Sequence, residues 1–409
     1  MMTNRKIQLI GLGAGGIDTL PTSHKELIFS ADLIFGAERH LEDIPANIKK
    51  KSWSKNIRND LKKIKNIKNK KICILATGDP LFYGVGNLVM EFFSIDEVDI
   101  LPSPSILSLC CAKIGQNIKD VDAVSLHGRD FNSIISYLQP NSKLFVLSHD
   151  KNTPTKIIKL LKDLNFESSL IYIFENVGRN DEKITKKIIK DCHNFSCANL
   201  NSVFIDIRTS KDTNFYPNSV GLADSLYKND GQITKSEIRA ITISKLEPLN
   251  NSIMWDIGGG SGSISIEWSL INNAAKIYTI EQNKKRIGFI RENIKKFAIK
   301  NITVLHESAP DILEILEKPD RIFIGGGLAS DKGDKIINKS LDCLKQTGII
   351  VANGVTAETE SLLIGMYKVY GGELSKYSVS NLKKIGKLHA WDQQMHVTQW
   401  KYKKGPDAR

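Results

Sequence analysis

Residues 254–268, MWDIGGGSGSISIEW, combine residue types that could bind a nucleotide-like cofactor. Asp256 lies in an apolar run, Gly258, Gly260 and Gly262 follow at every second position, and an apolar pattern with helical spacing begins after them. Glycines allow a tight turn and let a ligand approach the backbone, and the free N–H groups at a helix N-terminus attract anionic or polar groups. The segment therefore predicts a strand, a ligand-binding loop and a helix, in that order.

An acidic residue further along the chain narrows the choice of cofactor. Glu281 ends the next apolar run, where a carboxylate can accept hydrogen bonds from both hydroxyl groups of a ribose. A dinucleotide-binding G-x-G-x-x-G pattern would need a glycine where Ser263 stands. An acid followed by G-x-G-x-G is instead typical of class I methyltransferases that use S-adenosylmethionine (SAM). SAM is thus the favoured cofactor, with a dinucleotide or a purely structural turn as the alternatives.

The segment DGQITKSEIRA, residues 230–240, precedes this loop. Thr234 and Glu237 stand three residues apart before an apolar pattern, which predicts a capping box at a helix N-terminus. Thr234 is also a candidate for the entrance of the cofactor site, and the two roles are compatible.

A further glycine-rich turn, IQLIGLGAGG, occupies residues 7–16. By itself it is weak evidence for a nucleotide site, because no acid follows it at the distance of a ribose. It is accompanied by LATGDPLFYGVG at residues 75–86. There Gly78, Asp79 and Pro80 close an apolar run with a residue free to take positive φ, an acceptor side chain and a fixed turn. A ligand site and a structural turn are both compatible with this pattern.

Strand-like apolar runs alternate with helical patterns along the whole chain, which predicts an α/β fold with largely parallel sheets covered on both sides. The polar stretch 208–232 lacks this periodicity and predicts a linker. We therefore expect one domain at residues 1–207 and another at 231–409, joined by residues 208–230. The predicted strands are residues 6–13, 71–78, 98–102, 143–148, 169–176, 202–207, 253–257, 276–280, 302–306, 321–325 and 348–353.

The composition is basic, with a formal net charge of +12. Such a balance fits nucleic acid, an anionic membrane surface or an acidic small-molecule substrate as a partner. No apolar run approaches the roughly 18 residues of a membrane span. Six cysteines without a secretion signal predict reduced thiols and a cytoplasmic protein. Cys192, His193 and Cys197 lack the further ligands of a zinc site, so no metal is expected.

The segment 221–382 resembles the decarboxylating methyltransferases of cobalamin biosynthesis that act on precorrin-6. The pattern Asn-Pro-Pro-Tyr of base-methylating enzymes is absent after the fourth strand, where IGGGLAS stands. The family's usual Asn-Pro-Val near the C-terminus is replaced by QQMHVTQW at residues 393–400. Four motifs carry the resemblance, in the order DGQITKSEIRA, DIGGGSGSISIE, ESAPDILEILEKPDRIFIGGG and VANGVTAETESLL.

Residues 5–207 resemble the class III tetrapyrrole methyltransferases, and among them the members that methylate carbon 5 of precorrin-6. The stretches that carry this resemblance are IGLGAGGIDTL, FSADLIFGAERHLEDIP, LATGDPLFYGVG, PSPSILSLCCAKIG and VSLHGRD. The two resemblances together imply a tetrapyrrole methylase fold of two subdomains followed by a Rossmann-like class I SAM methyltransferase domain.

The resemblances also imply an activity. They imply two SAM sites, methylation of precorrin-6 at carbons 5 and 15, and removal of the carboxylate of the ring C acetate side chain. An acidic tetrapyrrole would account for part of the positive charge. A homo-oligomer is expected, and neither nucleic acid nor a membrane is expected as a partner. The alternative is a basic, RNA-binding SAM-dependent methyltransferase.

Candidate site residues follow from matching the motifs position by position. Arg239 and His389 are candidates for substrate contacts, with a packing or surface role as the alternative for each. No catalytic residue is assigned, because SAM carries an activated methyl group and no nucleophilic side chain is required. The resemblance places one SAM site at Gly78, Asp79, Pro80 and Ser105, and the other at Thr234, Gly258, Gly259, Gly260, Ser261, Gly262, Glu281, Ser308 and Ala309.

Overall fold

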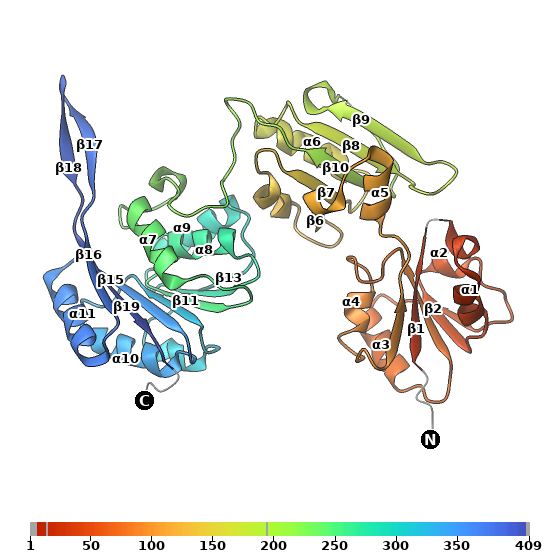
Figure 1. Ribbon diagram of the computed structural model, residues 1–409, viewed down its shortest axis with the longest axis horizontal. Coiled ribbons are helices and arrows are strands. Elements are labelled where there is room, and N and C mark those ends of the chain that lie inside the picture. The colour runs from red at the N-terminus through yellow and green to blue at the C-terminus, as the bar shows by residue number, and fades with distance from the viewer. Residues whose placement is uncertain (1–5, 14, 194, 406–409) are drawn as a thin grey trace. The chain divides into compact units, whose positions relative to one another are not determined.

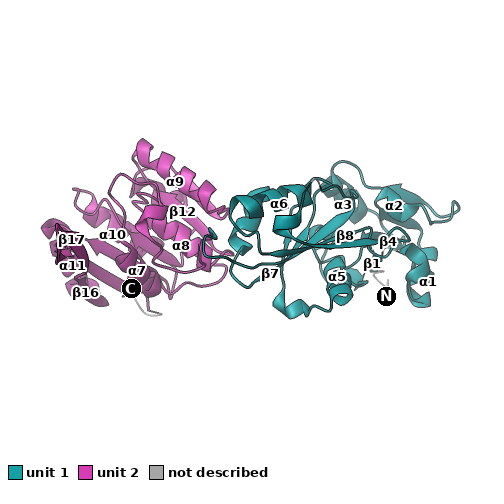
Figure 2. Cartoon of the chain, turned by 90° about the horizontal axis from the view of Figure 1, so that it is seen from above, with its two compact units in different colours: residues 1–214 teal, residues 215–409 magenta. Residues whose placement is uncertain are grey.

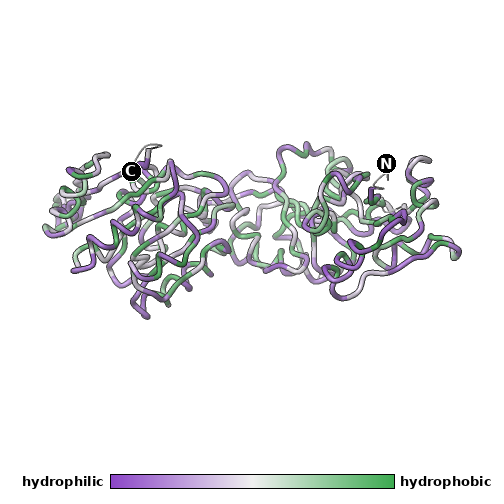
Figure 3. The backbone as a smooth tube through the Cα atoms, turned by 90° about the horizontal axis from the view of Figure 1, so that it is seen from below, coloured by the Kyte–Doolittle hydropathy of each residue, from purple (hydrophilic) through white to green (hydrophobic). Residues whose placement is uncertain are grey.

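The computed structural model describes residues 6–13, 15–193 and 195–405 (Figure 1). The chain divides into two compact units, unit 1 at residues 1–214 and unit 2 at residues 215–409 (Figure 2). Each unit is an α/β structure with its own sheets and buried cores, which confirms the expected fold class. Hydrophobic and hydrophilic stretches alternate along the backbone of both units (Figure 3). None of the helices in the described ranges is long and apolar enough to cross a membrane.

A five-stranded parallel sheet begins unit 1, in the order β3-β2-β4-β1-β5. Leu12 pairs with Thr77, so the turns that follow β1 and β4 are adjacent. Buried apolar side chains pack on both faces of this sheet. Its strands are β1 (Ile7–Leu12), β2 (Leu33–Gly36), β3 (Lys50–Ser52), β4 (Ile72–Thr77) and β5 (Val98–Leu101). The helices around it are α1 (Thr22–Phe29), α2 (Glu38–Leu41), α3 (Ile57–Lys65) and α4 (Gly86–Val89), with a 3₁₀ turn at Gly16–Thr19.

A second, mixed sheet completes unit 1, in the order β6-β7-β10-β8-β9. Only the β6–β7 pair is parallel among these strands. The strands are β6 (Asp122–Ser125), β7 (Lys143–Leu147), β8 (Leu170–Glu175), β9 (Lys183–Ile188) and β10 (Asn201–Asp206). The helices are α5 (Ile106–Ile114) and α6 (Thr153–Asp163), with 3₁₀ segments at Ile118–Asp120, Phe131–Tyr137 and Ile189–Asp191.

Unit 2 is built on a seven-stranded sheet in the order β13-β12-β11-β14-β15-β19-β16. The first five strands of this order are parallel, and β19 runs antiparallel to β15 and β16. The strands are β11 (Ile253–Ile257), β12 (Lys276–Ile280), β13 (Ile302–Leu305), β14 (Arg321–Ile324), β15 (Ile349–Gly354), β16 (Glu373–Tyr377) and β19 (Val397–Lys403). The helices are α7 (Ser236–Leu246), α8 (Ser263–Ile271), α9 (Lys284–Lys296), α10 (Gly333–Cys343) and α11 (Ala357–Tyr370), with 3₁₀ segments at Asp224–Leu226 and Asp311–Ile315.

Two further strands of unit 2, β17 (Ser380–Ile385) and β18 (Leu388–Gln393), form a hairpin of their own. In Figure 1 this hairpin extends beyond the seven-stranded sheet from the end of β16. The cores on the two faces of the seven-stranded sheet contain Trp255 and Trp400 in one cluster and Trp268 in the other. The apolar, β-branched runs of the sequence therefore supply the strands that need burial on both sides.

Residues 215–230 pack against the rest of unit 2. The rings of Tyr216 and Tyr227 lie 4.6 Å and 5.2 Å from the ring of Phe297, which follows α9. Leu222 belongs to the same buried cluster. The residues between Tyr216, Leu222 and Tyr227 are mostly polar, which gives residues 215–230 the composition of a linker. The three apolar side chains nevertheless attach this stretch to unit 2. We therefore propose that the C-terminal domain begins near residue 215 rather than at 231.

The proposed boundary predicts different behaviour for two fragments. Residues 215–409 should fold alone and bind SAM. Residues 231–409 should melt at a clearly lower temperature, because they lack Gly221, Leu222 and Tyr227, which donate three of the hydrogen bonds to the buried carboxylate of Glu267. Circular dichroism melting and SAM titration calorimetry of both fragments measure this. Equal melting temperatures would contradict the boundary.

Candidate cofactor sites

The glycine-rich loop of unit 2 lies at the carboxyl end of β11, between β12 and β14. The backbone N–H groups of Gly258 and Gly259 donate to the carbonyl of Ile280 at 2.9 and 3.0 Å. Gly258 has a φ of 78°, and a Cβ atom there would lie 2.6 Å from the backbone nitrogen of Gly326. Gly260 has a φ of 58°, but the nearest atom to its Cβ position, the carbonyl oxygen of Gln232, is 3.5 Å away. A side chain at position 258 would therefore clash with the backbone of the protein, whereas position 260 has only ordinary contacts and lies on the cavity wall, where a ligand could approach it.

Glu281 follows β12 and joins this loop. Its Oε2 accepts a hydrogen bond from the N–H of Gly260 at 2.9 Å, and its Oε1 accepts one from the N–H of Asn283 at 2.8 Å. The carboxylate is buried but still on the wall of a cavity. A carboxylate offers about four acceptor positions, so two remain for hydroxyl donors. This donor and acceptor set fits the ribose of an adenosine-containing cofactor.

A cavity of about 970 Å³ opens over the carboxyl ends of these strands. That volume accommodates a nucleotide-sized ligand with room for part of a substrate. Gly262 is the exception among the expected residues, because its Cβ position faces the side chain of Ile290 at 3.1 Å. The expected residues that line the cavity are Thr234, Gly258, Gly259, Gly260, Ser261, Glu281, Ser308 and Ala309. The cavity is also lined by Gln394, Met395 and Val397, so the segment QQMHVTQW contributes to its wall.

Asp256, the acid of the glycine motif, lies beneath the loop. It is buried, and the Ser265 hydroxyl donates to its Oδ2 at 2.5 Å. Burial raises the pKa of Asp256 to about 6, and the nearby charge of Glu281 acts in the same direction. Asp256 is absent from the cavity wall, so its part is to support the loop from below.

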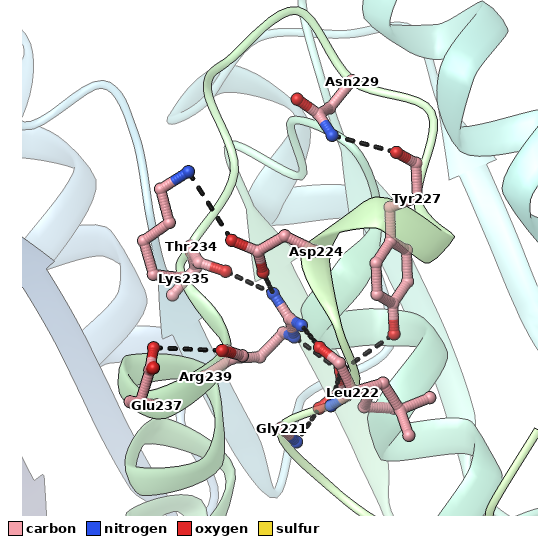
Figure 4. Close-up of polar contacts among 11 residues, drawn as sticks. Gly221, Leu222, Asp224, Tyr227, Asn229, Thr234, Lys235, Glu237 and Arg239 are labelled. Carbon is pink, nitrogen blue, oxygen red and sulfur yellow. Dashed lines mark hydrogen bonds and ion pairs between the residues drawn. The ribbon is translucent and has the colours of Figure 1, made fainter. Parts of the chain in front are cut away.

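The expected capping box at Thr234 and Glu237 is wrong. Helix α7 begins at Ser236 with Lys235 as its N-cap, and no side chain caps it. The Thr234 carbonyl instead accepts a hydrogen bond from the guanidinium of Arg239 (Figure 4). The Thr234 carbonyl thus pairs with a side chain five residues further along, and Thr234 lies on the cavity wall without capping the helix.

Arg239 belongs to a buried ion cluster that fixes this entrance. Its Nε donates to Glu267 at 2.6 Å and its Nη1 to Asp224 at 3.0 Å, and it also donates to the Leu222 carbonyl (Figure 4). The guanidinium lies 4.9 Å from the centre of the Tyr227 ring. Burial and the adjacent Glu267 raise the pKa of the Tyr227 phenol above its ordinary range. Arg239 is fully buried and absent from the cavity wall, so the structure assigns it packing rather than substrate contact.

Glu267 on α8 is the centre of that cluster. Its two oxygens accept hydrogen bonds from the N–H groups of Gly221 and Leu222 and from the Tyr227 hydroxyl, at 2.6, 3.0 and 2.9 Å. Glu267 was not predicted as a site residue. The pattern SISIEWSL predicts an apolar helix, and a single acid in such a helix does not indicate that the acid is buried. His389, the other candidate for a substrate contact, lies exposed on β18 and is absent from the cavity wall.

In unit 1 the turn Gly78-Asp79-Pro80 follows β4. The N–H of Gly78 donates to the carbonyl of Leu12 at 2.6 Å, and Asp79 Oδ1 accepts from the N–H of Leu81 at 2.8 Å. A Cβ atom on Gly78, whose φ is 57°, would lie 3.2 Å from the Pro104 carbonyl oxygen and 3.7 Å from Ser105 Cα. The structure therefore brings the Gly78 turn beside Ser105, which caps α5 by accepting from Ser108 N–H at 3.1 Å.

Further polar side chains lie around this turn. The guanidinium of Arg39 donates to Thr77 Oγ1 at 2.8 Å, and His40 Nε2 lies 2.9 Å from the same hydroxyl. Burial, reinforced by the charge of Arg39, lowers the pKa of His40 to about 4, so its imidazole is neutral at pH 7. Tyr83 takes a φ of 53° and lies under the guanidinium of Arg129 at 5.2 Å. Such backbone strain in a non-glycine residue often marks a functional site.

Metal ligands do not gather in the part of the chain that the structure describes: no group of three or more His, Cys, Asp or Glu side chains could hold an ion. Cys192 and Cys197 direct their thiols to the carbonyls of Ile188 and Lys151 instead.

The Glu281→Ala variant should bind SAM about 10- to 150-fold more weakly in the cavity of unit 2, because a charge-assisted hydrogen bond is worth about 1.5–3 kcal/mol. Titration calorimetry of the full chain measures this as the loss of one class of sites. Glu317→Ala, which removes an exposed glutamate that pairs with Lys276, is the matched control and should leave both affinities unchanged. Equal SAM binding by the two variants would exclude Glu281 from the cofactor site.

Comparison with known proteins adds to this geometry. Residues 6–192 match the family model of tetrapyrrole (corrin/porphyrin) methylases, and residues 225–404 match the model of a precorrin methyltransferase domain. A probable cobalt-precorrin-6B C(15)-methyltransferase (decarboxylating) of Saccharolobus solfataricus is 40% identical over 139 residues, which cover 33% of this chain and 69% of the relative. A cobalt-precorrin-7 C(5)-methyltransferase of Salmonella typhimurium is 30% identical over 179 residues, 44% of this chain and 88% of the relative.

Some relatives span both units. The precorrin-6Y C(5,15)-methyltransferase [decarboxylating] of a Sinorhizobium species is 33% identical over 401 residues, which cover 98% of this chain and 96% of the relative. The similarity thus includes both glycine-rich turns and the cavity residues of unit 2, and nothing among the comparisons favours an RNA-binding enzyme. The chain belongs to the family of decarboxylating precorrin-6Y C(5,15)-methyltransferases.

Proposed function

We propose that this protein methylates precorrin-6Y at carbons 5 and 15 and removes the carboxylate of the ring C acetate side chain. The observation that carries the proposal is the 33% identity to the Sinorhizobium enzyme over nearly the whole of both chains. The two separate relatives with single activities, at carbon 5 and at carbon 15, support a division of the chemistry between the two units.

Each unit holds one SAM molecule in this proposal. When bound, SAM supplies a methyl group activated by its sulfonium. In unit 2 the open backbone at Gly260 leaves room for the cofactor, Glu281 holds the ribose, and Ser308 and Ala309 lie on the same wall. In unit 1 the Gly78 turn after β4 and the Ser105 cap of α5 lie beside each other and present backbone and hydroxyl groups. The protein's contribution to methyl transfer is to orient the acceptor carbon toward this methyl group and to exclude water.

Product mass tests the proposed activity. The full chain is incubated with SAM and reduced precorrin-6Y, and the product is weighed by mass spectrometry. Two added methyl groups and the loss of one carbon dioxide are expected. An unchanged precorrin mass, with methylation of RNA in a parallel reaction, would overturn the proposal in favour of the RNA-binding alternative.

We also propose that the chain forms a homo-oligomer through the β17–β18 hairpin. Four large apolar side chains on it are exposed, Leu382 by 56%, Ile385 by 64%, Leu388 by 75% and Trp391 by 71%. Leu382 pairs with Trp391 on one face and Ile385 with Leu388 on the other. An isolated two-stranded hairpin is only marginally stable in water. A second copy of the same hairpin would cover one of these apolar faces in a symmetric contact.

The oligomer proposal predicts a change of mass in solution. The double variant Leu388→Glu/Trp391→Glu should be monomeric by light scattering, whereas the wild-type chain should have at least twice that mass. Ile315→Glu changes an equally exposed apolar residue of unit 2 outside the hairpin and should leave the mass of the assembly unchanged. A monomeric wild-type chain would rule out the assembly.

The six cysteines are all free thiols in this structure. This agrees with a reducing compartment, and we propose the cytoplasm as the site of the reaction.

A further inference from the structure

A cluster of neutral polar side chains lies where α7, β15 and β19 meet. Gln399 stands opposite Asn353 in the β15–β19 pair, and its Nε2 donates to Asn353 Oδ1 at 2.8 Å and to Thr242 Oγ1 at 3.1 Å. Asn353 Nδ2 donates to the same hydroxyl at 3.0 Å, and that hydroxyl donates to the Ile238 carbonyl at 2.7 Å. Thr242 and Gln399 are 0% and 2% exposed. The amide of Asn353 is therefore held in one orientation.

One N–H group of the Asn353 side-chain amide remains available to a ligand. Asn353 is half-buried and lines the cavity of unit 2. Its nitrogen carries two N–H groups, and among the described residues Thr242 accepts one of them. Its oxygen is already used by Gln399. The second N–H is therefore available to an acceptor on a molecule bound in the cavity.

Asn353 lies away from the ribose site. Glu281 follows β12 and Asn353 stands near the end of β15, with β11 and β14 between these strands. Three strand spacings of about 4.8 Å separate the two strand ends by about 14 Å. This distance leaves the β15 side of the cavity to the substrate, because the cofactor occupies the glycine-rich loop and the β12 side.

The β15 side of the cavity is also uncharged. The wall residues from α7, from the end of β15 and from the start of β19 are Ile238, Asn353, Val355, Gln394, Met395 and Val397. The three cationic residues of the wall, including Lys235 at the N-cap of α7, each pair with a carboxylate of the protein. These pairs are Lys235 with Asp224 at 3.5 Å, Arg286 with Asp230 at 3.0 Å and Lys332 with Asp311 at 3.7 Å.

We propose that Asn353 binds the acetate carboxylate that is lost, and that Thr242 and Gln399 position its amide. In this step the bond between the acetate methylene and its carboxylate carbon breaks and carbon dioxide leaves. The electron pair passes into the conjugated macrocycle, and a proton from water completes the methyl group. A cation would stabilise the starting carboxylate in an apolar pocket, whereas a neutral N–H orients it with less stabilisation of the charge that must disappear. This inference rests on the proposed function.

The test uses the full chain with SAM and reduced precorrin-6Y, and compares carbon dioxide release with carbon 5 methylation. Asn353→Ala and Asn353→Asp should lower carbon dioxide release by roughly 10- to 150-fold, which is the loss of one hydrogen bond to a charged group. Product that has been methylated but keeps its carboxylate should accumulate. Carbon 5 methylation, circular dichroism and SAM affinity by calorimetry should match the wild-type protein.

Two further variants separate positioning from packing. Thr242→Val should reproduce part of the defect because it frees the Asn353 amide, and Thr242→Ser should restore activity because it keeps the hydroxyl. Asn273→Asp, at an exposed position of unit 2, is the control for the change of charge. Folded Asn353 variants that release carbon dioxide at the wild-type rate, or that lose SAM affinity in the same proportion, would overturn the inference. Failure of the wild-type chain to methylate precorrin at all would instead overturn the proposed function.

Discussion

The Gly260→Val variant should lose methylation at carbon 15 together with carbon dioxide release, while unit 1 still binds SAM. The Cβ position of Gly260 has no protein atom within 3.4 Å, so a valine side chain would occupy cofactor space rather than displace the backbone. A β-branched residue is also strained at the φ of 58° that Gly260 adopts. We expect no detectable second methyl group by mass spectrometry and one remaining SAM site by calorimetry.

The same substitution at Gly288 is the matched control. Gly288 lies within α9, its Cβ position is free of neighbours, and it is absent from the cavity wall. Gly288→Val should keep both methylations. Asp79→Ala combined with Pro80→Ala should have the reverse effect on the two SAM sites, because it changes the turn of unit 1. A folded Gly260→Val protein that adds both methyl groups would refute the assignment of two sites.

The Glu267→Ala variant should unfold unit 2 at much lower urea concentration, with a loss of about 3–5 kcal/mol in the free energy of unfolding. Glu267 is fully buried and accepts hydrogen bonds from Arg239, Tyr227 and two backbone N–H groups. Its removal leaves a buried guanidinium with one fewer partner charge and breaks the attachment of residues 221–227 to α8. Four of the five tryptophans lie in unit 2, so tryptophan fluorescence reports this transition.

Glu292, which belongs to an exposed ion pair, is the control for the buried Glu267. Glu292 pairs with Lys228 at 2.6 Å, with 57% and 53% of their side chains exposed. Glu292→Ala should cost no more than about 1 kcal/mol, because exposed pairs are solvated and entropically loose. Glu267→Gln should lie between the two, since its amide nitrogen would face an N–H donor in place of an acceptor. A Glu267→Ala protein as stable as Glu292→Ala would mean that the buried cluster contributes little to the fold.

Local patterns predicted the features that depend on neighbours in the sequence. The apolar runs became β1, β4 and the strands of unit 2 around the glycine-rich loop, because burial on both faces of a parallel sheet requires continuous apolar side chains. The strand β9, KITKKI, and the hairpin of β17 and β18 were not predicted, because they are largely exposed and lack this pattern. Gly258 and Glu281 were predicted to lie near each other because each directly follows a predicted strand, β11 or β12, along the chain.

By itself, then, the sequence determined the α/β class, the two methyltransferase units, the glycine-rich loops and the acid that follows β12 on the cavity wall. Only the tertiary structure decided that Thr234 lines the cavity instead of capping α7, that Arg239 pairs with Glu267, and that residues 215–230 pack on unit 2. It also placed Gln399 opposite Asn353, two residues 46 positions apart. Periodicity and turn chemistry encode what a residue does within a few positions of itself. The partners of buried polar groups depend on which strands and helices, distant in the sequence, pack against one another. No local pattern in a single sequence indicates those tertiary contacts.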